Sequence, residues 1–144
     1  MRFGGRIFKV DRYWAVEVPV FGVVTQGKTK KEAYEMIADA IESLVNKEGF
    51  KVEVYPGEGE YFEVYSKDLA TMIAFLLRRQ RIKHGLSLAE AAERLGAKSL
   101  NTYARYEQGK SVPTVEKFNQ LLSAVSPEKD FVLIESRDHR SIQA

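Results

Sequence analysis

The sequence predicts an α+β protein in which a small sheet covered by one helix precedes an all-helical domain. In residues 1–65 the apolar side chains alternate over several short runs, as in half-buried strands, and only one stretch has helical spacing. From residue 67 onward the apolar side chains recur every three or four positions, as on the buried stripe of amphipathic helices. We therefore expect domains at residues 1–65 and 67–126, followed by a C-terminal strand or tail at 127–144.

The first domain is expected to have the element order βββαβ, with an optional last strand. The strands are predicted at residues 6–10, 13–18, 23–26, 51–55 and 61–65. The helix is predicted at 30–47, with Thr29 as N-cap, Glu32 completing a capping box and Gly49 ending it. Acidic residues fall on the face of this helix opposite its apolar stripe, as expected of a solvated surface.

The second domain is expected to contain a helix-turn-helix motif. After a first helix at 67–84, Ser87 and Glu90 have the spacing of a capping box at the start of a second helix, and Gly96 is placed to end it. A third helix begins near Ser99 and stops before Gly109, and a fourth follows Thr114. Two short helices joined by a tight turn with a glycine are typical of a helix-turn-helix.

The outward face of the third helix is predicted to bind DNA. Asn101 can pair with adenine, Thr102 can contact a thymine methyl group or a phosphate, and Arg105 can pair with guanine. Lys98 and Lys110 flank the helix and are expected to contact phosphates. The predicted DNA-binding set is Lys98, Ser99, Leu100, Asn101, Thr102, Arg105 and Lys110. Tyr103 and Tyr106 are interpreted as core residues.

The charge distribution agrees with this interpretation. Residues 67–144 contain 13 Lys and Arg against 9 Asp and Glu, whereas residues 1–66 contain 9 against 11. The excess of positive charge therefore falls in the proposed DNA-binding half. The chain has no cysteine, no apolar run long enough to span a membrane and no signal-peptide pattern, so we expect a cytoplasmic protein without disulfides.

The first domain resembles the HicB antitoxins. The stretch PVFGVVTQGKTKKEA at residues 19–33 has Pro and Gly before a strand, then Thr-Gln-Gly, then the pattern Thr-x-x-Glu-Ala. The preceding aromatic-rich stretch DRYWAVEVP is also similar to that family. The sequence departs from the family at Val20, Phe21 and Lys28, where an acid is common.

The helix-turn-helix resembles the Xre class, which many HicB proteins carry at the C-terminus. Arg81 matches an Xre arginine that is either structural or a phosphate contact, and we leave both roles open. Leu88 and Leu100 stand where many Xre domains have glutamine, so the contacts of those amides are not carried over. Glu107 is expected to hold the loop after the third helix.

These resemblances imply a truncated RNase H-like domain followed by a DNA-binding domain. They also imply an antitoxin that neutralises a HicA-like mRNA-cleaving toxin and represses its own operon. The expected partners are the toxin, double-stranded operator DNA and further copies of the chain, in a homodimer or a higher even oligomer. Trp14, Val20 and Phe21 are proposed to face the toxin, with burial in the sheet as the competing interpretation.

Catalysis by the first domain is not expected. RNase H-type chemistry needs several carboxylates around two divalent cations, and the candidates are Asp11, Glu17, Asp39 and Glu53. Asp39 lies on the acidic, solvated face of the predicted helix, and Asp11 lies at a predicted turn. We therefore expect a binding domain with no metal and no cofactor, and not an enzyme.

Residues 131–134 are apolar and β-prone, and they follow the last helix. We expect them to pair with another chain or with the first domain, because an isolated strand leaves backbone groups unpaired. A dimer would set two recognition helices about 34 Å apart on one face of DNA. Two other functions stay open: a repressor whose first domain binds a metabolite, and an enzyme that cleaves or binds RNA.

Overall fold

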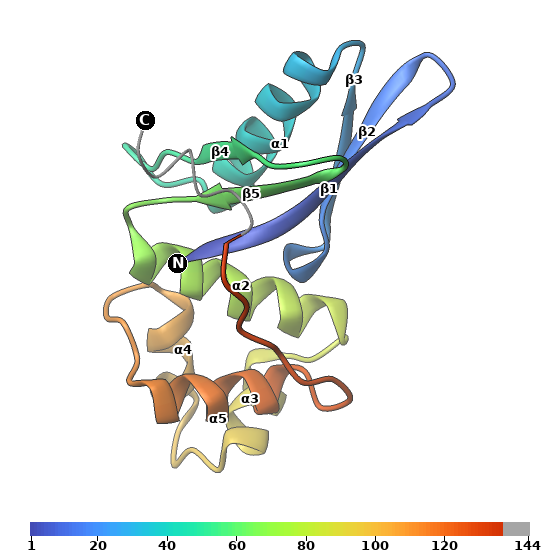
Figure 1. Cartoon of the computed structure of the whole chain (residues 1–144). Helices are drawn as coiled ribbons and strands as arrows, with labels where there is room; N and C mark the ends of the chain where they lie inside the picture. Colours follow the sequence, from blue (N-terminus) through green and yellow to red (C-terminus); the bar gives the residue numbers. More distant parts are fainter. Residues whose placement is uncertain (137–144) are drawn as a thin grey trace. The chain divides into compact units, whose positions relative to one another are not determined.

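The computed structural model describes residues 1–136, which divide into two compact units (Figure 1). The α/β unit contains Met1–Lys67 and the return of the chain from Ile134 to Ser136, and the helical unit contains Asp68–Leu133. The α+β class predicted from the sequence is confirmed.

The α/β unit is built on an antiparallel five-stranded sheet in the order β3-β2-β1-β5-β4. Its elements are β1 (Arg2–Val10), β2 (Tyr13–Val18), the 3-10 turn η1 (Pro19–Phe21), β3 (Val23–Gly27), α1 (Lys30–Val45), β4 (Glu53–Pro56) and β5 (Tyr61–Tyr65). The predicted ranges of β2 and β5 are confirmed. The last strand, β5, which the sequence left optional, is present and pairs with the central strand β1. The first strand begins at Arg2 rather than at residue 6.

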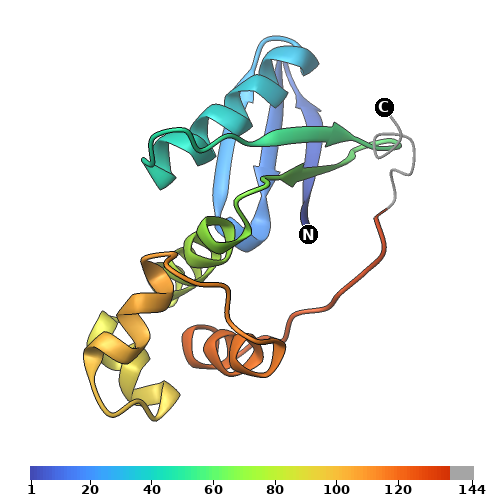
Figure 2. The same ribbon diagram turned by 90° about the vertical axis from the view of Figure 1, so that its left-hand side faces the viewer.

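One face of the sheet packs against α1 (Figure 2). Alternate residues of the strands point to this face, and the helix contributes residues spaced by four, so the two periodicities meet in one apolar layer. The fully buried residues of this layer are Ile7, Val16, Val18, Ala33, Ile37, Ile41, Phe62 and Val64.

Gly27 allows β3 to approach the first turn of α1. A Cβ atom on Gly27 would lie 2.4 Å from the backbone nitrogen of Ala33, which no side-chain rotation can relieve. We expect Gly27→Ala to lower the free energy of unfolding by about 1–3 kcal/mol, the usual cost of overpacking. Urea denaturation followed by Trp fluorescence would measure this, with Gln26→Ala, exposed on the same strand, as the control. Equal stability of both variants would contradict this role for Gly27.

Both ends of α1 differ in part from the prediction. Thr29 caps the helix by accepting a hydrogen bond from the Glu32 N–H at 3.0 Å, as expected. The Glu32 carboxylate, however, accepts from the Lys28 N–H at 3.4 Å rather than from Thr29, so the capping box is not formed. The helix ends at Asn46, which has φ 52°, and Gly49 lies in the following turn. Asparagine can take the left-handed conformation that ends a helix, so the stop precedes the glycine.

Phe21 is a core residue, which corrects its assignment to the toxin-facing surface. Its side chain is only 1% exposed and its ring lies 4.9 Å from that of Phe3. The 3-10 turn η1 causes this burial, because it turns the side chain of Phe21 inward after β2. The turn ends at Gly22, which has a left-handed backbone with φ 61°. Trp14 and Val20 are half-buried and remain accessible.

The C-terminal segment returns to the sheet at a buried carboxylate. Glu63 is 2% exposed and accepts hydrogen bonds from Arg2 at 3.0 Å, from the Tyr61 hydroxyl at 2.9 Å and from Ser136. Residues 131–134 form no strand within the single chain, so they do not pair with the first domain, and the apolar side chains of Val132 and Leu133 are almost fully exposed. Their pairing with a second chain stays a prediction.

The helical unit contains α2 (Leu69–Lys83), α3 (Leu88–Leu95), α4 (Leu100–Glu107) and α5 (Val115–Val125). The four predicted helices are confirmed, including the Thr114 cap, whose hydroxyl accepts from the Lys117 N–H at 3.1 Å. Each helix contributes at least one fully buried residue to the core: Leu77, Ala91, Tyr103, and both Leu121 and Val125.

Candidate nucleic-acid interface

Local hydrogen bonds fix the bounds of α3 as the sequence predicts. The Ser87 hydroxyl accepts from the Glu90 N–H at 3.0 Å, and the Glu90 carboxylate accepts from the Ser87 N–H at 3.1 Å. Hydrogen bonds from Ser87 lower the pKa of Glu90, which keeps this carboxylate ionised at the positive end of the helix. Gly96 ends α3 with φ 76° and begins the turn to α4.

The helix α4 is anchored by one face and leaves the other free. Tyr103 is fully buried against the other helices of the unit, and this burial raises the pKa of its hydroxyl well above 10. Tyr103 therefore stays neutral at physiological pH. The helix begins after Ser99, whose hydroxyl lies 3.2 Å from that of Thr102.

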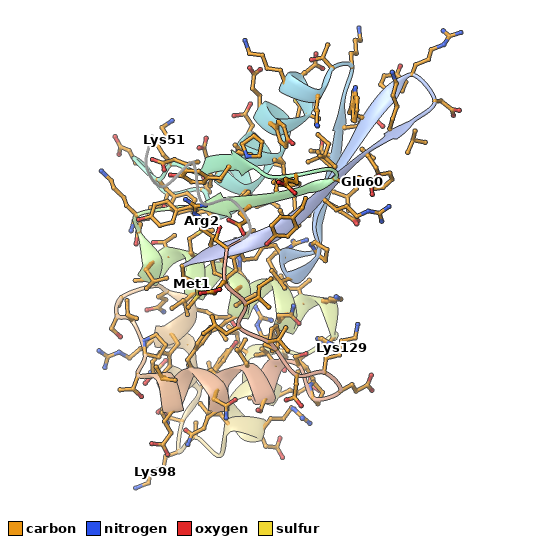
Figure 3. All side chains as sticks on the ribbon, in the orientation of Figure 1. Met1, Arg2, Lys51, Glu60, Lys98 and Lys129 are labelled. Atoms are coloured by element: carbon orange, nitrogen blue, oxygen red, sulfur yellow. The ribbon has the colours of Figure 1, made fainter. Side chains whose placement is uncertain are left out.

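All seven residues predicted to bind DNA are exposed. Five of them, Lys98 to Thr102, form a continuous run through the turn and into α4, and Lys98 projects outward from the turn (Figure 3). Arg105 continues the same exposed face of α4, and Lys110 follows its C-terminal end. Leu100 is 45% exposed, so the surface also presents an aliphatic side chain that can contact thymine methyl groups.

A buried ion pair holds α4 against α2. Arg81 donates from Nε to Glu107 Oε2 at 2.7 Å and from Nη2 to Oε1 at 3.1 Å, and its Nη1 donates to the Leu86 carbonyl at 2.9 Å. The two side chains are 15% and 7% exposed. The hydrogen bonds to Glu107 raise the pKa of Arg81, so it stays charged. Of the two roles left open for Arg81, a structural contact or a phosphate contact, the structure shows the structural one. Glu107 was expected to hold the loop after α4, and instead its carboxylate holds α4 itself against α2.

This ion pair also determines the charge of the exposed face of α4. Glu107 is the only acidic residue in α4, and its carboxylate is turned inward and neutralised by Arg81. The exposed face therefore carries Arg105 with flanking Lys98 and Lys110 and no carboxylate. Such a surface attracts phosphates, because the attraction between nucleic acids and proteins is dominated by charge.

Sequence reasoning missed two contacts that fix the helices. The inward orientation of Arg81 and of Glu107 had a signal, though their pairing did not, since each lies four residues after a buried residue, Leu77 or Tyr103, and so continues a buried helical face. The second contact is a hydrogen bond from Arg94 Nε to the Ala124 carbonyl at 2.8 Å, which fixes the end of α3 to the end of α5. It had no sequence signal.

This arrangement of two short helices, with a Gly turn between them and an exposed basic face on the second, defines a helix-turn-helix DNA-binding domain. Residues 77–125 match the family model of the helix-turn-helix. The protein is accordingly a DNA-binding transcription regulator. No curated protein matches the sequence.

The candidate carboxylates for metal chemistry do not gather. Within residues 1–136, no three His, Asp or Glu side chains lie close enough together to hold a metal ion. In the same part of the chain, no helix has the length and apolar character needed to cross a membrane.

Proposed function

We propose that the protein is a HicB-type antitoxin. It binds a small HicA-like mRNA-cleaving toxin through its α/β unit and represses its own operon as a dimer on operator DNA. The observation that carries the proposal is the joining of a helix-turn-helix unit to a separate α/β unit with the HicB-like motif. The α/β unit acts by binding and not by cleavage.

The motif residues have definite structural roles in the α/β unit, which supports the resemblance. Gly22 takes a left-handed conformation after η1, Gly27 allows the close approach of β3 to α1, and Thr29 caps α1. Together these three residues determine the path of the chain from β2 through β3 into α1.

The outer face of α1 fits a basic toxin better than the surface around Trp14. Glu35 and Asp39 are exposed there and have no ion-pair partner among residues 1–136. Met36 lies next to them on the helix, with 39% of its surface exposed. A protein that binds mRNA must present Lys and Arg to phosphates. Exposed carboxylates next to apolar side chains complement such a surface.

Copurification tests the proposed function directly. The chain would be expressed from its native operon with a tag, and the complex weighed by light scattering and mass spectrometry. We expect a small basic protein from the adjacent gene to be retained at high salt, in a complex with an even number of copies of this chain. Purification of the chain alone would contradict the antitoxin function and favour a repressor without a toxin.

Charge reversal on α1 tests the surface. We expect Glu35→Lys/Asp39→Lys to weaken binding of the copurified toxin by about tenfold to a hundredfold, because two carboxylates facing Lys and Arg become like charges. Glu48→Lys/Glu58→Lys, at two other exposed positions of the α/β unit, is the control with the same charge change. Calorimetric titration would measure both. Equal affinities would place the toxin elsewhere, with Trp14 and Val20 as the next candidates.

A further inference from the structure

A basic patch surrounds the only tryptophan of the protein, at the end of the α/β unit where β1 turns into β2. Its centre is Trp14 on β2, with Lys9 on β1 and Lys30 at the start of α1. Two more exposed cations lie close by in the chain, Arg12 in the turn between β1 and β2 and Lys28 just before α1. Neither the helix-turn-helix nor the proposed toxin surface on α1 accounts for it.

Strand register brings these residues together although they are distant in the sequence. Trp14 lies opposite Lys9 on β1 and opposite Gly27 on β3, and α1 begins three residues after Gly27. The Nζ atoms of Lys9 and Lys30 each lie 5.6 Å from the centre of the indole ring. Two elements thus each place a cation over or beside the same aromatic ring.

The cations of the patch are available to a ligand. All four are exposed, and none has an ion-pair partner within residues 1–136. Trp14 is half-buried, so part of its indole faces solvent. Burial of the remaining part against the protein holds the ring in place, which lowers the entropy lost when a ligand stacks on it.

We propose that this patch binds single-stranded nucleic acid. An aromatic ring bordered by Lys and Arg is the arrangement that binds such strands, because bases stack on the ring and phosphates contact the cations. Lysine side chains are flexible, so an ammonium can leave the indole for a phosphate while a base takes its place. A duplex keeps its bases paired and stacked, so it would contact the cations but not Trp14.

The proposal is independent of the toxin. If the α/β unit also binds a toxin on α1, the patch gives the same unit a place to hold an RNA strand. If no toxin exists, the patch remains a second nucleic-acid site on a DNA-binding protein. RNA and single-stranded DNA share the chemistry that the patch recognises, and the experiment distinguishes them.

The test is fluorescence anisotropy of the full chain with labelled oligo-U RNA, oligo-dT and a duplex of equal length, at several salt concentrations. We expect Lys9→Gln/Lys30→Gln to weaken binding of the single strands by about tenfold. It should also lower the slope of log affinity against log salt by about 1.4, since each lost phosphate contact lowers it by about 0.7. Stronger binding of oligo-U than of oligo-dT would identify RNA as the ligand, and the reverse would identify DNA.

Trp14 variants test the stacking. We expect Trp14→Leu to weaken binding about fivefold to a hundredfold, and Trp14→Phe, which keeps a ring, to weaken it much less. Circular dichroism would establish that each variant is folded. The charge control is Lys47→Gln/Lys51→Gln, at two exposed lysines elsewhere in the α/β unit.

Three outcomes would overturn the proposal. The first is an equal loss of affinity in the charge control, Lys47→Gln/Lys51→Gln, and in Lys9→Gln/Lys30→Gln, because the net positive charge of the protein would then explain the binding. The second is loss of binding to a copurified protein in the patch variants with unchanged oligonucleotide binding, which would make the patch a protein contact. The third is retention of binding in all variants of the patch with loss of binding in Lys98→Gln/Arg105→Gln, which would assign the strand to the helix-turn-helix.

Discussion

Replacing Glu107 by alanine is expected to lower the free energy of unfolding of the helical unit by about 3–5 kcal/mol, because it leaves the buried charge of Arg81 without its partner. The variant should also bind DNA weakly, since α4 loses its polar link to α2. Urea denaturation followed by far-UV circular dichroism would measure the helical unit. Trp14, the only tryptophan, lies in the α/β unit and reports on that unit separately by fluorescence.

Two further variants separate the cause of this effect from a general loss of packing. Arg81→Met/Glu107→Leu removes both charges together and should recover most of the stability, because replacing a whole buried ion pair by apolar residues is often neutral. Glu116→Ala, at an exposed position of α5, should have little effect. If Glu107→Ala were as stable as Glu116→Ala, the ion pair would not hold α4.

Elements whose bounds are set by neighbouring residues could be predicted from the sequence. The start of α3 depends on Ser87 and Glu90, which are three residues apart and bond to each other. The start of β1 is different, because Gly4 and Gly5 are poor strand formers by propensity. A Cβ on Gly5 would lie 2.3 Å from the ring of Phe62 on β5, so here strand pairing, and not local preference, requires glycine.

The candidate DNA-binding face was predictable for a similar reason. Helical periodicity alone separates buried Tyr103 from exposed Asn101, Thr102 and Arg105. The burial of Phe21 was not predictable, because it depends on a 3-10 turn that alternation does not reveal. The ion pair of Arg81 with Glu107 joins residues 26 positions apart, and spacing within either helix cannot identify the partner.

Arg105 and Lys110 are expected to differ in what they contribute to DNA binding. Arg105 projects from the exposed face of α4, which can enter the major groove, so Arg105→Ala should cost about 1–3 kcal/mol on the preferred sequence and relax the choice of base at one position. Lys110 follows α4, is exposed, and is expected to contact a phosphate. Lys110→Ala should weaken binding to all sequences alike and lower the salt slope by about 1.

Selection from a random duplex library would define the preferred sequence without assuming which operon the protein controls. The affinity of each variant for that sequence and for random DNA would then be measured at several salt concentrations. Because base contacts are lost only on the preferred sequence, Arg105→Ala should reduce the ratio of the two affinities, whereas Lys110→Ala should leave the ratio unchanged. An equal loss on both DNAs for Arg105→Ala would make Arg105 a phosphate contact, and sequence recognition would then depend on Asn101 and Thr102.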